Sequence, residues 1–395
     1  MEYEETIYEL RERRLGYKIS QQKLAGQIGI TREYLSRIES GKKRASDELI
    51  KKIDLALRCL SPEEPLEVLF DYMRIRFPTT DTKEVIEKLL RIRQDFMYLE
   101  EWGHYGYAGK YLIGDVVVMF SPDIKKGVLL ELKGKGCRQF EQYLQAQGRN
   151  WYDFLYEVKK AGGVMKRVDL AINDKLGMLS ISELEKKCSH DECISRFRTY
   201  DGYRSGELSR HREEHKTEMG TTLYIGSKKS EVYFCFYEKD YEQYIKKGTP
   251  LIQAEVKNRY EIRVMNDRAE KAVDDLMRYG DAGKTAFAII REYMRFVDQG
   301  TTKDRYSWQM NKDWLAFIGM ECRKLKLTMA PEPYTLDKTK KWLLHQASGS
   351  LKMLTILDQQ QDTNFVGTMI LDAKLSRQQE KVMGQQIADI GDIIL

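Results

Sequence analysis

The alternation of apolar and polar residues divides the chain into a helical N-terminal part and a longer part that mixes strands with helices. Apolar side chains recur at helical spacing in Gln21–Ile28 and again in Arg32–Glu39. Gly29 permits a tight turn between the two segments, and Thr31 is a suitable N-cap for the second. We therefore predict two short amphipathic helices joined by a tight turn.

From about Leu66 the pattern changes to runs of period two, which is typical of strands, interleaved with amphipathic helices. Strands are expected at Phe70–Phe77, Tyr111–Phe120, Gly127–Lys133, Met165–Ile172, Thr222–Ile225, Val232–Glu238 and Tyr260–Val264. Helices are expected at Lys83–Tyr98, Cys137–Gln147 and Trp151–Lys160, and the chain after about Ala282 is again helical in pattern. Such a mixture favours a mixed or antiparallel sheet covered by helices, so we predict the α+β class.

The two N-terminal helices resemble a known DNA-binding motif. The segment SQQKLAGQIGITREYLSRIESGKKR is similar to the Cro/repressor type of helix-turn-helix, because apolar, turn and cap residues fall at the expected offsets. The resemblance implies that the second helix faces the major groove and that the basic residues after it lie near the backbone. The residues expected to contact DNA are Thr31, Arg32, Glu33, Tyr34, Ser36, Arg37, Lys42, Lys43 and Arg44. The alternative is a helical bundle used for protein contact.

Charge and composition limit the kinds of partner. The chain has 66 Lys and Arg against 61 Asp and Glu, and the net charge of +5 is too mild for coating DNA by bulk charge. Apolar stretches such as Val116–Phe120 are far shorter than the roughly 18 residues of a membrane-spanning helix. The six cysteines are scattered, which is typical of reduced thiols in the cytosol. We expect a cytoplasmic protein without membrane insertion.

Three predicted strands carry a carboxylate where a purely structural strand needs none. Asp169 shares a strand face with Arg167 and with the small Ala171, which leaves space above the carboxylate for a divalent cation. Glu131 and Glu261 likewise lie among apolar or aromatic neighbours and cations. Hard oxygen ligands without a supporting His or Cys favour Mg²⁺ or Mn²⁺. The alternative is that the carboxylates pair as cross-strand salt bridges.

The segment TTLYIGSKKSEVYFCFYEKDYEQY combines a cationic turn with a tyrosine-rich strand. Its turn is able to hold phosphate through hydroxyl, ammonium and backbone N–H groups. Tyr237 and Lys239 share a strand face, and a nearby charge helps a phenol of ordinary pKa about 10 to act as a nucleophile. Packing within the sheet is the structural alternative, since the chain has 24 tyrosines. The residues expected to bind phosphate are Ser227, Lys228, Lys229, Ser230, Arg259 and Arg263.

Five motifs together carry a resemblance to a known family: GVMKRVDLAIND, CRQFEQYLQAQ, DGYRSGELSR, TTLYIGSKKSEVYFCFYEKDYEQY and AEVKNRYEIRV. The chain resembles the MobT-type relaxases of Gram-positive conjugative elements, relatives of the plasmid rolling-circle replication initiators of the Rep_trans group. In that family a tyrosine attacks one DNA strand at the origin, with a divalent metal held by acidic residues. The resemblance implies that Tyr237 is the nucleophile, that Tyr241 and Tyr244 are its rivals, and that Lys239 assists. The implied metal ligands are Asp169, Glu131 and Glu261.

The resemblance also implies the organisation and the partners of the protein. It predicts a helix-turn-helix DNA-binding domain at 1–63, a relaxase domain at 64–281 and a helical C-terminal region at 282–395. The expected activity is nicking and religation of an origin through a 5′-phosphotyrosine, which initiates conjugative transfer or rolling-circle replication. Expected partners are the duplex origin, the single-stranded nick site, a host helicase and a conjugative coupling protein. The alternative is a transcriptional regulator whose large second domain senses a ligand or partner, without catalysis.

Overall fold

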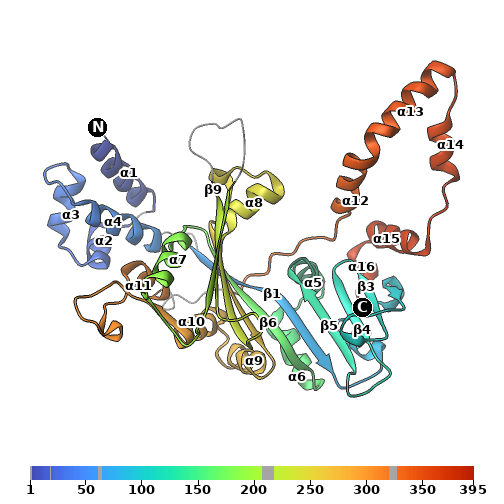
Figure 1. The fold of residues 1–395 in the computed structure, drawn as a ribbon, viewed down its shortest axis with the longest axis horizontal. Coiled ribbons are helices and arrows are strands. Elements are labelled where there is room, and N and C mark those ends of the chain that lie inside the picture. Colours follow the sequence, from blue (N-terminus) through green and yellow to red (C-terminus); the bar gives the residue numbers. More distant parts are fainter. Residues whose placement is uncertain (1, 18, 61–64, 207–217, 320–326) are drawn as a thin grey trace. The chain divides into compact units, whose positions relative to one another are not determined.

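The computed structural model describes residues 2–17, 19–60, 65–206, 218–319 and 327–395 (Figure 1). Contacts within the chain define two compact units. The first unit comprises Met1–Leu69, Leu170–Val264 and Tyr279–Thr328, and the second comprises Phe70–Asp169, Met265–Arg278 and Met329–Leu395. The predicted boundary between residues 63 and 64 falls outside the described residues.

The N-terminal segment of the first unit is a four-helix bundle of α1 (Glu2–Gly16), α2 (Gln21–Ile28), α3 (Arg32–Glu39) and α4 (Asp47–Leu60). Gly29 ends α2 with φ 76°, a conformation that glycine adopts without strain. The Thr31 hydroxyl accepts a hydrogen bond from the backbone N–H of Tyr34 at 3.2 Å and caps α3. The predicted turn and cap are thus confirmed. Buried side chains from all four helices form the core of the bundle: Ile7, Leu10, Leu24, Leu35, Ile38, Ile53 and Leu57.

Within the described residues, ten strands form one sheet in the order β2-β3-β4-β5-β1-β6-β11-β10-β9-β8. Their bounds are β1 (Leu66–Phe77), β2 (Tyr98–Glu100), β3 (Gly109–Ile113), β4 (Val116–Phe120), β5 (Val128–Lys133), β6 (Val164–Asp174), β8 (Tyr200–Gly206), β9 (Glu218–Ile225), β10 (Val232–Glu238) and β11 (Asn258–Met265). The neighbours β1–β5, β4–β5, β9–β10 and β10–β11 pair antiparallel. A separate two-stranded sheet joins β7 (Cys193–Ser195) to β12 (Met294–Phe296). The predicted α+β class is confirmed.

Helices complete both units. Those of the first unit, besides the bundle, are α7 (Ile181–Ser189), α8 (Lys239–Lys247), α10 (Ala282–Tyr293) and α11 (Lys312–Gly319). The second unit holds α5 (Gly134–Ala146), α6 (Trp151–Lys160), α12 (Asp337–Trp342), α13 (Ser348–Gln361), α14 (Phe365–Asp372), α15 (Arg377–Ile387) and α16 (Ile390–Ile393), and α9 (Asp267–Tyr279) lies almost wholly in it. Among the described residues, no helix is both long and apolar enough to cross a membrane.

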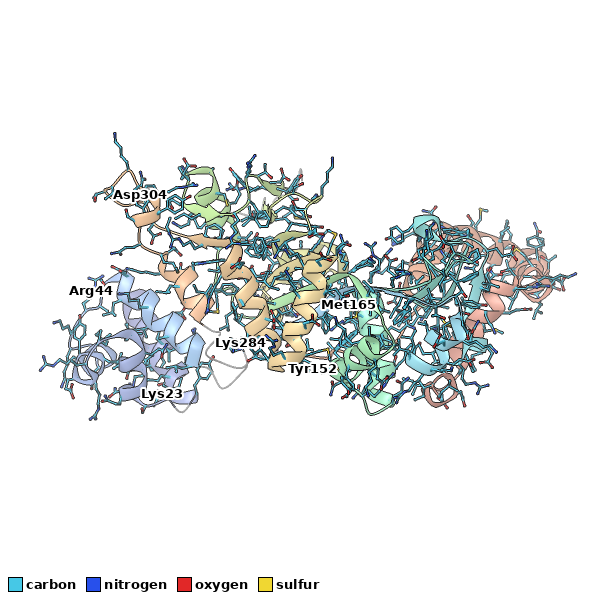
Figure 2. All side chains as sticks on the ribbon, turned by 90° about the horizontal axis from the view of Figure 1, so that it is seen from below. Lys23, Arg44, Tyr152, Met165, Lys284 and Asp304 are labelled. Atoms are coloured by element: carbon cyan, nitrogen blue, oxygen red, sulfur yellow. The ribbon has the colours of Figure 1, made fainter. Side chains whose placement is uncertain are left out.

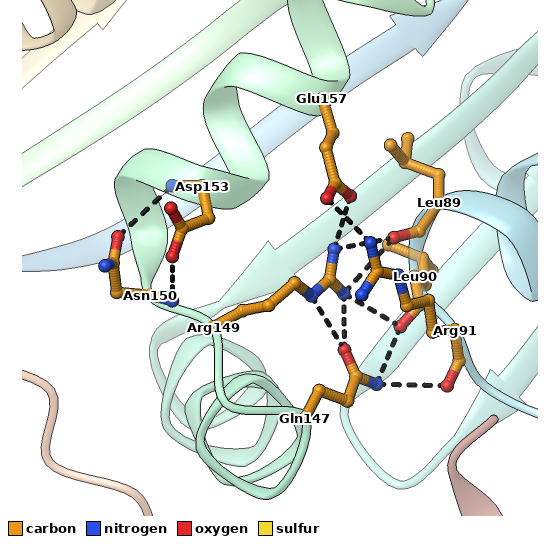
Figure 3. Close-up of polar contacts among 8 residues, drawn as sticks. All are labelled: Leu89, Leu90, Arg91, Gln147, Arg149, Asn150, Asp153 and Glu157. Atoms are coloured by element: carbon orange, nitrogen blue, oxygen red, sulfur yellow. Dashed lines mark hydrogen bonds and ion pairs between the residues drawn. The ribbon is translucent and has the colours of Figure 1, made fainter.

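The single helix expected over Lys83–Tyr98 is wrong, because the segment holds a π-helical turn at Glu84–Leu89 and a separate 3-10 turn at Gln94–Phe96. Arg91 then takes a positive φ of 53°, which ends the helical path. Side chains from the α5–α6 connection bind the carbonyl groups released at this point (Figure 3). Gln147 donates to the carbonyl of Arg91 at 3.0 Å, and Arg149 donates to that of Leu89 at 3.2 Å. Tertiary hydrogen bonds thus replace those of a continued helix.

The single strand expected over Tyr111–Phe120 is also wrong, because the chain reverses within it and forms the hairpin of β3 and β4. Gly114 lies in the turn with φ 58°. The backbone N–H of Asp115 donates to the Gln139 side chain at 2.8 Å, which fixes the turn against α5. The run of apolar residues therefore contains a glycine turn, which the period-two alternation alone did not indicate.

Candidate active site

Tyr237 and Glu261 meet on one face of the first unit. Strand alternation places Tyr233, Cys235 and Tyr237 on the same face of β10. In the antiparallel register Cys235 lies opposite Glu261, and Tyr237 lies opposite Arg259. The Tyr237 hydroxyl donates a hydrogen bond to Oε1 of Glu261 at 3.0 Å. The phenol therefore has a carboxylate in place to receive its proton.

Arg263 fixes the position of Glu261, which is only 5% exposed. The guanidinium donates to Oε2 of Glu261 from Nε at 3.1 Å and from Nη2 at 2.5 Å. Its Nη1 donates to the Tyr233 hydroxyl at 2.7 Å. Burial opposes the charge of Arg263, but Glu261 and Tyr233 outweigh that effect and raise the pKa of the guanidinium. Glu261 thus keeps one oxygen for Arg263 and the other for Tyr237.

Lys239 places a cation near the phenol oxygen. It is the first residue of α8, directly after β10, and its Nζ lies 3.4 Å from the Tyr237 oxygen. The same ammonium group forms an ion pair with Glu242, which also pairs with Lys246. Burial alone would raise the pKa of Glu242, but the two lysines lower it. Lys239 is therefore held by Glu242 while it stays within reach of Tyr237.

A cavity of about 350 Å³ opens beside this group. Tyr237, Glu261 and Arg263 line it, together with residues of β9 and α8 such as Tyr224 and Ile245. The two rival tyrosines lie on α8 next to residues that line the cavity, but they are not lining residues themselves. Tyr241 packs against Gly220, where an added Cβ would come within 2.7 Å of it, and Tyr244 is 43% exposed on α8. Of the three candidate nucleophiles, only Tyr237 therefore lines the cavity in the described structure.

The predicted phosphate-binding turn follows β9 directly. Gly226 has φ 94°, and a Cβ at this position would approach the Phe197 ring to 2.9 Å, so the turn depends on glycine. Ser227 closes the turn by accepting the N–H of Lys229 on its hydroxyl at 3.2 Å. The exposed Lys228 lies 4.2 Å above the Tyr224 ring centroid. The turn is thus exposed and cationic, and one of its lysines covers a wall of the cavity.

The other two predicted phosphate ligands are engaged within the protein. Arg259 donates from Nε to the side-chain oxygen of Asn173 at 2.7 Å. Arg263 is bound to Glu261, as described above. We therefore place Arg263 as a support for the carboxylate in this structure, whereas its predicted phosphate contact stays a prediction.

Asp169 lies in the second unit and is held by a neighbour on its own strand. Arg167 donates to both carboxylate oxygens, from Nε at 2.8 Å and from Nη2 at 2.6 Å. The guanidinium also stacks over the Tyr72 ring at 4.1 Å. Asp169 is only 2% exposed, so this bidentate pair neutralises a buried charge.

Glu131, also in the second unit, is bound by two phenols and a lysine. The Tyr72 hydroxyl donates to Oε1, the Tyr105 hydroxyl donates to the same oxygen at 2.8 Å, and Lys133 lies 3.2 Å from Oε2. Burial favours the neutral acid, but these hydrogen bonds and the lysine lower the pKa of Glu131 overall. Burial and the Glu131 carboxylate raise the pKa of Tyr72. Nothing in the sequence pattern singles out Tyr72 or Tyr105, since both contacts depend on strand register and loop position.

The chemistry of these three carboxylates does not fit a preformed metal site. Each of the three carboxylates already pairs with a cation. Glu131 and Glu261 also accept a hydrogen bond from a tyrosine hydroxyl. Within the described ranges, no three His, Cys, Asp or Glu side chains cluster in a way that could hold a metal ion. A divalent ion would have to displace a guanidinium or an ammonium group. The carboxylates thus form salt bridges, as the alternative expected, but with a residue two positions away on the same strand and not across strands.

The predicted DNA-contacting residues lie on the outer side of the helical bundle. Thr31, Arg32, Glu33 and Arg37 are exposed on and before α3, while the opposite side of the helix buries Leu35. Tyr34 and Ser36 are partly exposed, and Lys42, Lys43 and Arg44 are exposed after the helix. The Lys43 ammonium group lies 4.8 Å from the Tyr34 ring. Figure 2 shows Arg44 and Lys23 at the surface of the bundle.

Comparison with known proteins identifies the class of protein that this fold and site define. Residues 163–370 match the family model described as replication initiation factor, and residues 67–157 match that of the rolling circle replication initiation protein N-terminal domain. Residues 10–64 match a helix-turn-helix model. The class is that of the relaxases and rolling-circle replication initiators.

Two relatives agree with this classification. The chain is 40% identical over 334 residues to NicK of Bacillus subtilis (strain 168), a protein assigned as a DNA relaxase, and the match covers 84% of this chain and 93% of NicK. A rolling circle replication initiator protein from Geobacillus stearothermophilus has a similar structure, with a TM-score of 0.57 and 25% identity, over 67% of this chain and 99% of that one. The chain belongs to the replication initiation factor family, which confirms the resemblance carried by the five motifs.

Proposed function

We propose that this protein is a relaxase that nicks one DNA strand at an origin by transesterification at Tyr237, and so initiates replication or transfer of the DNA that carries the origin. The observation that carries the proposal is the hydrogen bond from the Tyr237 hydroxyl to the buried carboxylate of Glu261 beside a cavity. Membership of the replication initiation factor family supports the reaction, and the geometry supports the residue.

In the proposed mechanism Glu261 accepts the phenolic proton as the Tyr237 oxygen attacks the scissile phosphorus. The P–O bond to the 3′ oxygen breaks in line, so the products are a 5′-phosphotyrosine and a 3′-hydroxyl that takes its proton from water. Lys239 stabilises negative charge on the phenol oxygen, and Arg263 keeps Glu261 oriented. Because the phosphotyrosine is itself a diester, the reverse attack by a 3′-hydroxyl religates the strand without a nucleotide cofactor.

A supercoiled plasmid that bears the cognate origin distinguishes the relaxase from the regulator alternative. The relaxase is expected to convert the plasmid to a strand-specific nicked form and to leave protein linked to the 5′ end. A regulator would bind the origin and leave the plasmid closed. A plasmid with a scrambled origin is the control. Closed plasmid in both cases, with intact binding to the origin, would contradict the proposal.

The helix-turn-helix supplies duplex binding in this proposal. Replacement of Arg32 and Arg37 by alanine is expected to weaken binding of origin duplex by about 1–3 kcal/mol per residue and to flatten its salt dependence. Cleavage of a single-stranded oligonucleotide should stay unchanged, because the two arginines lie on the helical bundle and not on the cavity. Fluorescence anisotropy over a salt series measures the effect. The exposed Lys271→Ala serves as control, and equal salt slopes for all variants would contradict this role.

A requirement for Mg²⁺ or Mn²⁺ remains part of the proposal as an implication of the family resemblance, and no step above depends on it. If Asp169 is a metal ligand, Asp169→Asn should raise the metal concentration for half-maximal nicking at least about tenfold. Metal titrations of the nicking rate, with Asp274→Asn as an exposed control, test this expectation. An unchanged titration curve would show that Asp169 only pairs with Arg167.

The other parts of the proposal concern the partner proteins, the location of the reaction and the domain limits. The sequence has no GxxxxGK[ST] loop, so strand separation is assigned to a separate host helicase, with a coupling protein during conjugation. The reaction is placed in the cytoplasm, where the expected DNA substrate and helicase occur. The predicted domain limits of 1–63, 64–281 and 282–395 stay part of the same proposal.

A further inference from the structure

An aromatic pair beside the cavity is not used by the mechanism above. Tyr203 on β8 and Tyr224 on β9 contact each other edge to face, with ring centroids 5.8 Å apart and an interplanar angle of 89°. The Lys228 ammonium group lies 4.2 Å from the Tyr224 ring and 5.9 Å from the Tyr203 ring. A single exposed tyrosine needs no explanation, but two rings shared by one lysine form a defined surface.

Strand register places this pair on the same sheet face as the nucleophile. Tyr203 and Tyr237 are both paired with Thr222, one from each side, so β9 alone separates them. Two strand spacings correspond to roughly 10 Å between their backbones. Tyr224, paired with Cys235, lines the cavity that Tyr237 lines. The aromatic surface is therefore continuous with the wall of the proposed reaction site.

Exposure and charge distinguish this surface from core packing. Tyr203 is 53% exposed, and every residue of β8 is exposed, so the ring contributes little to a hydrophobic core. Lys228 and Lys229 are exposed in the turn that follows β9. Single-stranded nucleic acid is bound by this combination, in which bases stack on aromatic rings and cations follow the phosphates.

We propose that Tyr203, Tyr224 and Lys228 form a platform for the single-stranded DNA that flanks the nick, with one base stacked on Tyr203 and the adjoining phosphate near Lys228. The inference rests on the proposed nicking function and adds the path of the strand. Tyr224 is the fixed wall, because its ring contacts both the Tyr203 ring and the Lys228 ammonium group. The strand then crosses β8 and β9 to reach Tyr237.

Fluorescence of 2-aminopurine tests the platform directly. Oligonucleotides spanning the nick site carry the probe at one position at a time, and stacking on a tyrosine quenches its emission. All proteins carry Tyr237→Phe, so that binding is measured without cleavage. We expect quenching at a position adjacent to the nick with Tyr203 present, and its loss with Tyr203→Ala. Affinity for the oligonucleotide should fall about five- to hundredfold in the same variant.

Three further variants give the test its controls. Tyr203→Phe and Tyr203→Trp retain a ring and should restore both quenching and affinity, whereas Tyr306→Ala removes a 63% exposed tyrosine of η5 (Arg305–Ser307) and should change neither. Thermal melting should be the same for all, because Tyr203 is exposed. Unchanged quenching in Tyr203→Ala, or a defect in Tyr203→Phe equal to that of alanine, would overturn the platform.

The two proposals fail in different ways. If the protein with Tyr237 intact forms no covalent adduct while quenching still depends on Tyr203, the nicking proposal fails and the platform stands. If the adduct forms and quenching is independent of Tyr203, the platform alone is wrong.

Discussion

Replacing Tyr237 by phenylalanine is expected to abolish the covalent protein–DNA adduct and to lower strand nicking by at least about a thousandfold. The variant keeps the ring that lines the cavity and loses only the oxygen that donates to Glu261. DNA binding should therefore be nearly unchanged. Denaturing gel electrophoresis of a labelled oligonucleotide separates the shifted adduct from free DNA.

Tyr241→Phe and Tyr244→Phe are the matched controls for this variant. Both residues lie on α8 within the same segment, and neither lines the cavity. Each should form the adduct within about threefold of the unmodified protein, because a surface or packing phenol outside the site contributes no nucleophile. Adduct formation by Tyr237→Phe, together with its loss in either control, would transfer the role to the rival tyrosine.

Replacing Glu261 by glutamine is expected to lower the rate of the covalent step by about 10²–10⁴-fold while oligonucleotide affinity stays within a fewfold. Glutamine preserves the size of the side chain and a hydrogen bond to the Tyr237 oxygen, but it cannot take the proton. Single-turnover cleavage with protein in excess isolates this step. Glu255→Gln, at a carboxylate 77% exposed, is the control.

The same variant separates the two roles considered for Glu261. A proton acceptor that has been removed is not replaced by added metal, so the defect of Glu261→Gln should persist as Mg²⁺ or Mn²⁺ is raised. A lost metal ligand would instead shift the titration curve and be overcome at high metal concentration. Cleavage by Glu261→Gln at the unmodified rate would contradict both roles. A melting curve checks that Arg263, which loses its charged partner, has not unfolded the protein.

Local chemistry explains what the sequence predicted of the fold. The turn at Gly29 and the cap at Thr31 depend on residues within three or four positions. β10 was predicted at its observed bounds because its run of apolar and aromatic residues lies between a polar turn and charged residues. The point at which helical structure ends within Lys83–Tyr98 depends instead on a segment distant in sequence. Gln147 binds the carbonyls that a continued helix would have paired, and no local pattern indicates that contact.

The sequence predicted the types of residue in the candidate site better than it predicted which of them contact one another. Arg167 and Arg263 each lie two positions from a carboxylate on the same strand face, so salt bridges to Asp169 and Glu261 were predictable as a kind of contact, although the alternative placed them across strands. The hydrogen bond between Tyr237 and Glu261 could not be predicted, since it depends on the register of β10 against β11. Sequence spacing cannot supply that register without the structure.

The central claim is that Tyr237 becomes covalently joined to DNA. The most direct test is peptide mass spectrometry of the protein after cleavage of an origin oligonucleotide and nuclease trimming of the bound strand. The account predicts a nucleotide on Tyr237, linked through a 5′ phosphate. A nucleotide on Tyr241, on Tyr244 or on any other residue would contradict it.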